Sequence, residues 1–494
     1  MSGPAVGRSD VVDADVIVVG GGSSGSVVAS RLSENPDCRV VVVEAGQGVS
    51  RVQDYPPDIA DAHVLPVGPG SPWTSSYPAE LAPGVEREIS RGRVLGGSGA
   101  VNGAYFIRAR PDDFLHWPSR WSYENVLPYF TASETDHDYA SDRHGSSGPI
   151  PVWRTAPKEW SGVTAAFVDA SESLGFPADP DKNDPSPVGG TGPVPLNVFR
   201  GMRMNAAATY LIPRLSRPNL EVLTESTVLK ILFDGDAACG VRILRRGVTT
   251  DMRASRVVLC AGAVRTPQLL MLSGVGPAES LRHCGIDVRL DHPRVGRGFS
   301  DHPEIGVYYR SSVPFRPSSP IEVVLHVGDL EIRPYTASFG YMIAGIGPVD
   351  PMIGIGLMRA DSRGDITLRS ADPLDSPFVR YRYLDSAADR AALHAGLDVV
   401  DALLSTAPMT AVATKLEVAG DRLLGRLGTA LHLSGSCAMG GPDAVLDDRC
   451  RVRGVYGLDV VDTSSFPVVP TRGPHATVIM LAERAARDIA DDLG

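Results

Sequence analysis

The sequence predicts an α/β fold in which a parallel sheet with covering helices is interrupted twice by a second, different domain. Short β-branched runs occur in three blocks of the chain, at residues 16–43, 220–260 and 457–462. Such runs are typical of parallel strands that helices cover on both faces. The intervening blocks, residues 111–214 and 311–429, differ in composition and in hydrophobic period.

A glycine turn at residues 20–25 follows the first apolar strand, residues 16–19. Gly20, Gly22 and Gly25 have the G-x-G-x-x-G spacing. In that motif the first glycine permits a tight turn, the second lets a pyrophosphate approach the backbone, and the third allows close packing of the next helix. Phosphate is favoured at the start of that helix, because free N–H groups and the helix dipole attract negative charge.

Glu44 ends a second β-branched strand at residues 39–43, close to the spacing after Gly20 that is expected for a ribose-binding carboxylate. A carboxylate at this place favours an adenosine ribose without a 2′-phosphate. The sequence therefore predicts FAD or NAD rather than NADP. The glycine turn does not distinguish FAD from NAD.

Two loop segments follow. Residues 47–90 are rich in proline, glycine and serine without a sustained period, so we expect an extended excursion that covers the ligand. Residues 92–103 combine many glycines with small residues, which lets backbone lie flat against a planar or charged group.

Sheet-like runs return after residue 220. They lead to Thr266-Pro267, which predicts a helix that begins at Gln268. Leu393, Leu397, Val400, Leu403 and Leu404 have the spacing of an apolar helix face that packs on a core. The predicted strands are residues 220–223, 228–233, 240–244, 256–260, 321–327, 354–358 and 366–368, and the last helix is residues 477–492.

Two histidines near the C-terminus are the candidate catalytic residues. His432 lies in a segment of small residues, and His475 directly precedes the last helix. A histidine with a pKa of about 6.5 can accept a hydroxyl proton near neutral pH, and a second one can hold the developing alkoxide. The helix after His475 would direct N–H groups at an electron-rich ring edge, and so stabilise charge gained on reduction. Between them, a strand at residues 457–462 ends in Asp462.

Composition excludes several classes of function. The chain has 494 residues, a formal net charge of −11 and no Lys/Arg cluster, which argues against nucleic acid as a partner. Six scattered cysteines form no C-x-x-C pair, so we expect neither a disulfide framework nor a metal site. No run is long enough to span a membrane, and residues 1–15 lack the apolar region of a signal peptide, so a cytoplasmic location is expected.

Four ordered motifs resemble the glucose–methanol–choline (GMC) family of FAD-dependent oxidoreductases, and together they extend over essentially the whole chain. Residues 301–303 and 362–364 are lesser matches. The motifs are the glycine turn with Glu44; residues 92–98 with Asn102; residues 262–276; and His432-x-x-Gly435-x-Cys437 with Asp462, His475 and the closing helix.

The resemblance implies a fold of two domains. Residues 1–110, 215–310 and 430–494 would form a Rossmann-like FAD-binding domain with a parallel sheet and helices. Residues 111–214 and 311–429 would form a discontinuous substrate domain with a mainly antiparallel sheet and helices.

The resemblance also implies roles for individual residues. His432 would take the hydroxyl proton while hydride leaves the carbinol carbon for the flavin, and His475 would hydrogen-bond the substrate oxygen. Some relatives attach FAD through a histidine at the position of Val101, so FAD is expected to be dissociable here. The implied cofactor contacts are Gly20, Gly22, Ser23, Ser24, Gly25, Glu44, Arg93, Gly97, Asn102, Gly103, Val228, Ala261, Gly262, Asp462 and Ala476.

A narrower resemblance concerns the donor. Residues 472–477 (Arg-Gly-Pro-His-Ala-Thr) and residues 331–335 are similar to the mycofactocin-associated GMC dehydrogenases of actinobacteria. This implies a dehydrogenase that oxidises mycofactocinol and passes electrons towards the respiratory chain. Two alternatives remain open: an alcohol oxidase that forms H2O2 from O2, and a flavoprotein of the hydroxynitrile lyase type without net redox chemistry.

Overall fold

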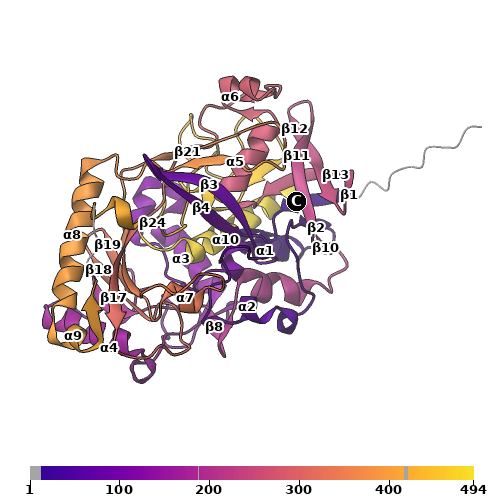
Figure 1. The fold of residues 1–494 in the computed structure, drawn as a ribbon. Helices are drawn as coiled ribbons and strands as arrows, with labels where there is room; N and C mark the ends of the chain where they lie inside the picture. The colour runs from indigo at the N-terminus through magenta and orange to yellow at the C-terminus, as the bar shows by residue number, and fades with distance from the viewer. Residues whose placement is uncertain (1–12, 187–188, 417–420) are drawn as a thin grey trace, which may run out of the picture.

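A computed structural model describes residues 13–186, 189–416 and 421–494. The prediction that there is no signal peptide concerned residues 1–15, and most of these lie outside the described residues. Figure 1 shows sheets on opposite sides of the molecule with helices between and around them. This mixture of parallel and antiparallel sheets with helices confirms the predicted α/β class. No helix among the described residues has the length and apolar character needed to cross a membrane.

The first sheet has a parallel core in the order β10–β2–β1–β13–β25. The valines of its two N-terminal strands are at most 3% exposed, as expected for strands that are covered on both faces. The strands are β1 (Asp13–Val19), β2 (Val40–Val43), β10 (Leu220–Leu223), β13 (Val248–Leu259) and β25 (Leu458–Val460).

Strand β13 belongs to both a parallel and an antiparallel part of this sheet. Its first half pairs antiparallel with β12 (Ala237–Arg245), which pairs antiparallel with β11 (Ser226–Asp234). From Val257 onwards, β25 lies beside β13 as a parallel neighbour. The four strands predicted between residues 220 and 260 are thus confirmed, with shifted boundaries.

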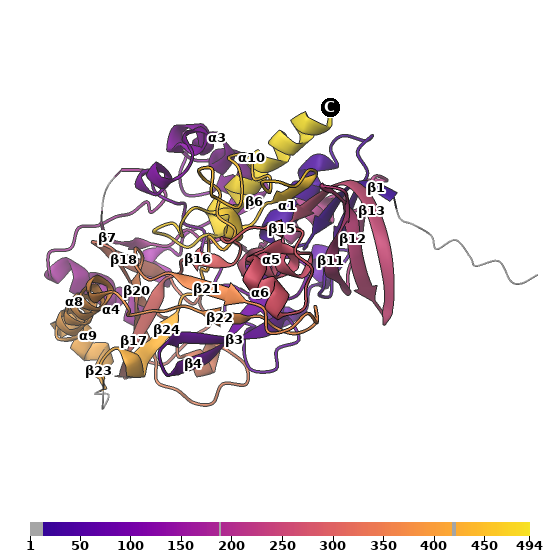
Figure 2. The ribbon, with the colours of Figure 1, turned by 90° about the horizontal axis from the view of Figure 1, so that it is seen from above.

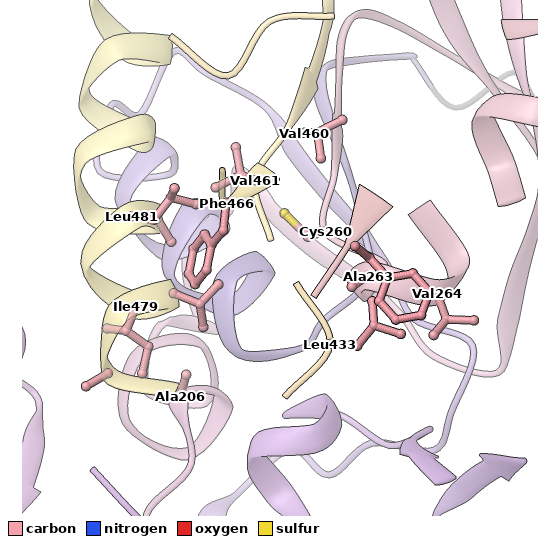
Figure 3. Packing of buried hydrophobic residues seen from close by; sticks show 14 of the residues in the cluster. Ala206, Cys260, Ala263, Val264, Leu433, Val460, Val461, Phe466, Ile479 and Leu481 are labelled. Atoms are coloured by element: carbon pink, nitrogen blue, oxygen red, sulfur yellow. The ribbon is translucent and has the colours of Figure 1, made fainter. Parts of the chain in front are cut away.

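Helices α1 (Ser23–Leu32) and α10 (His475–Leu493) lie side by side near the centre of the molecule (Figure 2). Glu483 of α10 links them, because it accepts hydrogen bonds from Arg31 Nε at 2.8 Å and from Tyr210 Oη at 2.6 Å. Figure 3 shows Ile479 and Leu481 of α10 in the buried core beside Phe466. The Arg31–Glu483 pair therefore joins the two helices, while the apolar face of α10 packs into the core.

The second large sheet is antiparallel throughout, in the order β23–β17–β20–β19–β18–β7, with β24 also on β17. Helix α8 (Ala387–Leu404) packs on it through the predicted leucines and Val400, all at most 5% exposed, which confirms the amphipathic helix. The strands are β7 (Gly190–Pro193), β17 (Pro303–Ser311), β18 (Val323–Val327), β19 (Leu330–Pro334), β20 (Met352–Leu357), β23 (Ala413–Lys415) and β24 (Leu427–Thr429).

The extended excursion expected over residues 47–90 was interpreted as lacking a sustained period, and this was wrong for its second half. Strands β3 (Thr74–Ala82) and β4 (Val85–Gly92) form a hairpin, and β3 continues into a sheet with β22 (Phe378–Arg380), β21 (Gly364–Thr367) and β16 (Arg297–Phe299). The side chains of Tyr77, Ala79 and Leu81 are buried at every second position. This alternation is the signal that the Pro- and Ser-rich composition obscured.

Helix α5 (Gly262–Leu272) begins at Gly262, so the predicted start at Gln268 was wrong. Pro267 lies inside the helix, where its missing N–H leaves the carbonyl of Ala263 without its usual i+4 donor. Ser436 Oγ donates to that carbonyl at 2.6 Å. A side chain from another segment thus replaces the lost bond and allows the helix to pass through the proline.

Candidate active site

The three glycines of the turn have different surroundings. Gly20 has φ +101°, and a Cβ there would lie 2.5 Å from the carbonyl oxygen of Cys260. A Cβ on Gly25 would lie 1.9 Å from the carbonyl oxygen of Gly20. A Cβ on Gly22 would meet only the Cα of Gly97, at an ordinary 3.7 Å. Close packing therefore requires a residue without a side chain at Gly20 and Gly25. Gly22 borders open space, which a phosphate of a ligand can occupy.

Helix α1 starts beside Gly22 without a side-chain cap and without an acidic residue in its first turn. Ser23 and Ser24 are its first two residues. The N–H groups of the first turn have no intrahelical acceptors, and they favour an anion. This end of the helix fits the pyrophosphate of a dinucleotide.

Glu44 is held at the end of β2. Its Oε2 accepts from the N–H of Gly21 at 2.8 Å, and its Oε1 accepts from the N–H of Gly46 at 2.7 Å. Burial raises the pKa of Glu44, while these hydrogen bonds and the charge of Arg93 act in the opposite direction. Each carboxylate oxygen keeps a lone pair for a ribose hydroxyl.

The glycine-rich segment 92–103 lies on this turn. Gly97 has φ +55°, and a Cβ there would lie 2.8 Å from the Cα of Gly22. Asn102 Oδ1 accepts from the N–H of Ala104 at 2.9 Å, and a Cβ on Gly103 would have only one neighbour, at 4.0 Å. The predicted close approach of backbone is therefore present in the structure, and room remains beside Gly103.

The remaining predicted cofactor contacts lie on the first sheet and at the start of α5. Val228 is buried in β11 beside a bulge, and Ala261 is the N-cap residue of α5. The carboxylate of Asp462 accepts from Gly262 N–H at 2.8 Å, Thr266 Oγ1 at 2.6 Å and Ser464 N–H at 2.8 Å. The Asp462 side chain therefore orients protein backbone. The expectation that Asp462 contacts the cofactor stays a prediction.

His432 is paired with a histidine that the sequence reasoning did not place in the site. Its Nδ1 lies 2.9 Å from Nδ1 of His302. Asp301 Oδ1 accepts from the backbone N–H groups of both histidines, each at 2.7 Å. Residues 301–303 had been noted only as a lesser family match, and the pairing itself has no signal in the sequence because 130 residues separate the two rings.

Both rings are neutral near pH 7. Burial and then the nearby His302 lower the pKa of His432 well below its usual value, and burial lowers the pKa of His302 to about 3. A hydrogen bond between two neutral imidazoles uses one N–H and one lone pair. When Nδ1 of His432 is the donor, its Nε2 carries a free lone pair, which is the form that a general base requires.

His475 is the first residue of α10, and Ala476 behind it is fully buried. Its Nδ1 lies 3.3 Å from Ser23 Oγ, and its Nε2 is buried without a hydrogen-bond partner. Burial lowers the pKa of His475 to about 4, so the ring is neutral. Gly473 lies in the loop just before His475 and packs against His432, because a Cβ on Gly473 would lie 3.6 Å from Cε1 of His432.

A buried polar network beside His432 was also missed as part of the site. Glu331 accepts from Tyr105 Oη at 2.5 Å and from Arg333 Nε at 2.6 Å, and it bonds His326 Nε2 at 2.8 Å. Burial lowers the pKa of His326 to about 3, so its ring is neutral and Nε2 donates. The sequence signal for this network was the segment at residues 331–335, which had been used only for the narrower family resemblance.

One group of possible metal ligands occurs among the described residues, namely Glu134, Asp136 and His144. Arg108 already binds Glu134, and Arg154 binds both oxygens of Asp136. The arginines supply the positive charge that a metal ion would bring, so we interpret the group as an ion-pair cluster.

Family models were compared with the whole chain. The model for the N-terminal part of GMC oxidoreductases matches residues 14–304, and the model for the C-terminal part matches residues 360–482. The chain belongs to the GMC oxidoreductase family. GMC enzymes of this kind are FAD-dependent, which confirms the predicted cofactor and the predicted enzyme class, an oxidoreductase for CH–OH donors.

Relatives of this GMC chain match it from end to end. An uncharacterized GMC-type oxidoreductase in the thcA 5′ region of Rhodococcus erythropolis is 47% identical, covering 97% of this chain and 99% of the relative. The 5-(hydroxymethyl)furfural oxidase of Methylovorus sp. (strain MP688) is 34% identical, covering 96% and 98%. The crystal structure of pyridoxine 4-oxidase from Mesorbium loti is 28% identical, with a TM-score of 0.89 over 96% of this chain and 99% of that one.

Proposed function

We propose that this GMC oxidoreductase is a dehydrogenase that oxidises a hydroxyl donor, with His432 as the base that removes the hydroxyl proton. Bound FAD supplies the acceptor for the hydride. The observation that carries the proposal is the neutral His432 ring, whose Nδ1 is held by His302 so that Nε2 is the nitrogen left for the donor.

His475 is proposed to hydrogen-bond the donor oxygen. Its Nε2 is the buried ring nitrogen without a protein partner, and an unpaired buried polar atom costs about 1–3 kcal/mol. The start of α10 has no side-chain cap and no acid in its first turn. It can therefore stabilise negative charge near Ala476. Ser23 fixes the His475 ring from the other side.

The cofactor is proposed to be held without a covalent bond, because Val101 offers no nucleophile. Glu44 would bind the ribose, the start of α1 the pyrophosphate, and Gly97 with Asn102 and Gly103 would lie along the ring. Arg93, which acts electrostatically on Glu44, is proposed to remain beside the adenosine half.

For the donor itself, we propose mycofactocinol, with electrons passed towards the respiratory chain; residues 472–477 support this. Two relatives favour a second candidate, an oxidase of hydroxymethyl groups on aromatic rings, because they are named as oxidases of 5-(hydroxymethyl)furfural and of pyridoxine. An oxidase would form stoichiometric H2O2 in an oxygen-uptake assay, and a dehydrogenase would not.

The test is anaerobic titration of the purified flavoprotein with aromatic alcohols and reduced mycofactocin, followed through the flavin absorbance. We expect bleaching with at least one donor, and a rate reduced by about 10²–10⁴ in His432→Ala, the usual effect of losing a general base. His394→Ala, an exposed site on α8, is the matched control and should leave the rate unchanged. Unchanged bleaching in His432→Ala would disprove the assignment of the base, and net turnover without any bleaching would indicate lyase chemistry.

A further inference from the structure

Arg472 is a buried cation for which the described protein supplies almost no partner. It is 7% exposed and lies three residues before His475. Its guanidinium donates one hydrogen bond, from NH1 to the carbonyl of the adjacent Thr471 at 2.6 Å, and its Nε is buried without a partner. Arg472 forms no ion pair within 4.0 Å with a carboxylate of the described residues.

The acidic groups around it are already engaged. Glu331 is bonded by three side chains, as described above, and Glu304 pairs with Arg333 at 3.2 Å and accepts from Tyr335 Oη at 2.9 Å. Asp113 accepts from the N–H and hydroxyl of Thr471 at 3.0 and 3.1 Å and from the N–H of Arg110 at 2.9 Å. Glu304 and Glu331 share Arg333, and none of these three carboxylates forms an ion pair with Arg472; Glu331 and Asp113 act on Arg472 only through their charge, which raises its pKa against the larger effect of burial.

Arg472 is adjacent in the chain to residues that contact the proposed base. Gly473, the next residue, packs between Tyr105 and His432, because a Cβ there would lie 3.0 Å from Tyr105 Cδ1 and 3.6 Å from His432 Cε1. The same short loop ends at His475, whose Nε2 is also unpartnered. Two buried nitrogens without hydrogen-bond partners, Arg472 Nε and His475 Nε2, thus lie on the loop whose Gly473 packs against the proposed base.

An isolated buried cation costs several kcal/mol, and burial accordingly lowers the pKa of Arg472. A carboxylate is the natural complement of a guanidinium, because two parallel N–H···O bonds match its fork geometry. We infer that Arg472 binds a carboxylate on the donor, so that the oxidised compound is an alcohol that carries an acid group. This inference rests on the proposed CH–OH oxidation but not on any particular donor.

The competing use of Arg472 is to bind the polar edge of the cofactor. The two uses differ in what they predict for a neutral donor. A group that serves the cofactor affects all donors alike, whereas a group that binds the donor carboxylate affects only donors that have one.

The experiment compares 4-(hydroxymethyl)benzoate with the neutral 4-methylbenzyl alcohol, which share the aromatic hydroxymethyl group. In the wild-type holoenzyme we expect the acid to have the higher kcat/KM. Arg472→Ala should lower kcat/KM for the acid by about 10²-fold, as expected for an ionic hydrogen-bonded pair that loses one partner, and should change the neutral alcohol less than about threefold. Arg472→Lys should retain part of the preference for the acid, because it keeps the charge without the fork.

Arg242→Ala is the matched control, because this arginine is partly exposed on β12 and pairs with Asp251 of β13 at 2.7 Å. It should leave both donors unaffected. Equal losses for the acid and the neutral alcohol in Arg472→Ala, or loss of bound FAD, would show that the guanidinium serves the cofactor and would overturn the inference. A preference of the wild type for the neutral alcohol would also overturn it.

A second measurement does not depend on turnover. Benzoate, which has no hydroxyl to oxidise, should perturb the flavin absorbance of the wild type on titration, with a Kd that rises about tenfold or more in Arg472→Ala. If benzoate binds in this Arg472-dependent way but no alcohol bleaches the flavin, the carboxylate site stands and the proposed oxidation fails. If alcohols are oxidised but benzoate binding is the same in both proteins, the carboxylate inference fails alone.

Discussion

Gly20, Gly22 and Gly25 are the same amino acid in one motif, yet the structure gives them different reasons to be glycine. Gly20 is required by its close approach to Cys260 at the end of β13, and Gly25 by its close approach to Gly20, since an added Cβ would overlap a carbonyl oxygen at either position. Gly22 has room for a Cβ, so packing within the protein does not explain the glycine, and we propose that the bound cofactor does. The motif therefore separates into residues that serve folding and one residue that serves binding.

This difference leads to the first prediction. Gly22→Ala should fold normally but bind FAD at least about 30-fold more weakly, a loss of roughly 2 kcal/mol, because the methyl group stands in the path of the pyrophosphate. Gly25→Ala should be destabilised by about 4 kcal/mol or more even as apoprotein, because its Cβ cannot avoid Gly20. Flavin retention after gel filtration and urea denaturation of the apoproteins measure the two effects. Equal flavin retention in Gly22→Ala and in the wild type would contradict the assignment.

At the level of single elements, helix α5 shows how a distant side chain corrects a local defect. Pro267, the sixth residue of the helix, lacks the backbone N–H that would donate to the Ala263 carbonyl. The hydroxyl of Ser436, which is fully buried, donates to that carbonyl instead.

The second prediction is a double-mutant cycle on this bond. Ser436→Ala should lower the free energy of unfolding by about 1–3 kcal/mol, because the Ala263 carbonyl is left unpaired. Pro267→Ala should restore most of that loss when combined with it, since residue 267 then has an N–H that reaches Ala263. Urea denaturation at saturating FAD measures all four proteins. Additive effects of the two substitutions would disprove the coupling.

Another element-level feature is the ion-pair cluster between β5 (Glu134–Asp136) and the loop that carries Asp181. His144 lies within 3.0 Å of Asp136 and 2.8 Å of Asp181. Burial alone would lower the pKa of His144, but the hydrogen bonds to Asp136, Asp181 and Glu134 outweigh it and raise the pKa to about 10.

The third prediction follows from that shift. Because the folded pKa lies above the unfolded value of 6.5, the stabilisation by His144 is complete below pH 6.5 and is lost as the pH rises through about 10. The urea midpoint of the wild type should therefore fall more steeply between pH 7 and pH 10 than that of His144→Gln. His394→Gln, an exposed histidine, should follow the wild type. Parallel curves for wild type and His144→Gln would show that the ring is neutral in the folded protein.

At the scale of the whole molecule, the candidate site gathers parts from the whole chain. The turn at residues 20–25 belongs to the first sheet, His302 precedes β17 of the second sheet, and the N-terminus of α10 meets that of α1 through His475 and Ser23. A cofactor that spans these parts stabilises the folded chain by mass action, because it binds only when they are assembled.

The fourth prediction concerns this coupling. FAD should leave the protein on denaturation without a covalent adduct, and the apoprotein should gain about 2.7 kcal/mol of stability at a free FAD concentration of 100 times Kd. Thermal unfolding of apoprotein at increasing FAD concentrations measures the gain. Flavin that remains attached to the denatured, precipitated chain would contradict the role assigned to Val101.

Sequence alone determined those features that are written in neighbouring residues. The β-branched runs predicted the strands, the leucine spacing predicted α8, and the glycine spacing with Glu44 predicted a dinucleotide site, because burial imposes a period on consecutive positions. Motif order over the chain then indicated the family, which the comparisons confirm.

Only the tertiary structure decided the relations between distant residues. Ser436 stabilises the proline in α5, His302 pairs with His432, and Arg472 is left without a carboxylate; none of these has a local signal, because the partners are far apart in the sequence. The start of α5 was wrongly predicted for the same reason, since the bond from Ser436 allows the helix to pass through Pro267. The β3–β4 hairpin was missed although its alternation is local, because the Pro- and Ser-rich composition obscured it. The sequence determined which chemical groups are present, and long-range packing decided which of them remain unpaired and so available to a ligand.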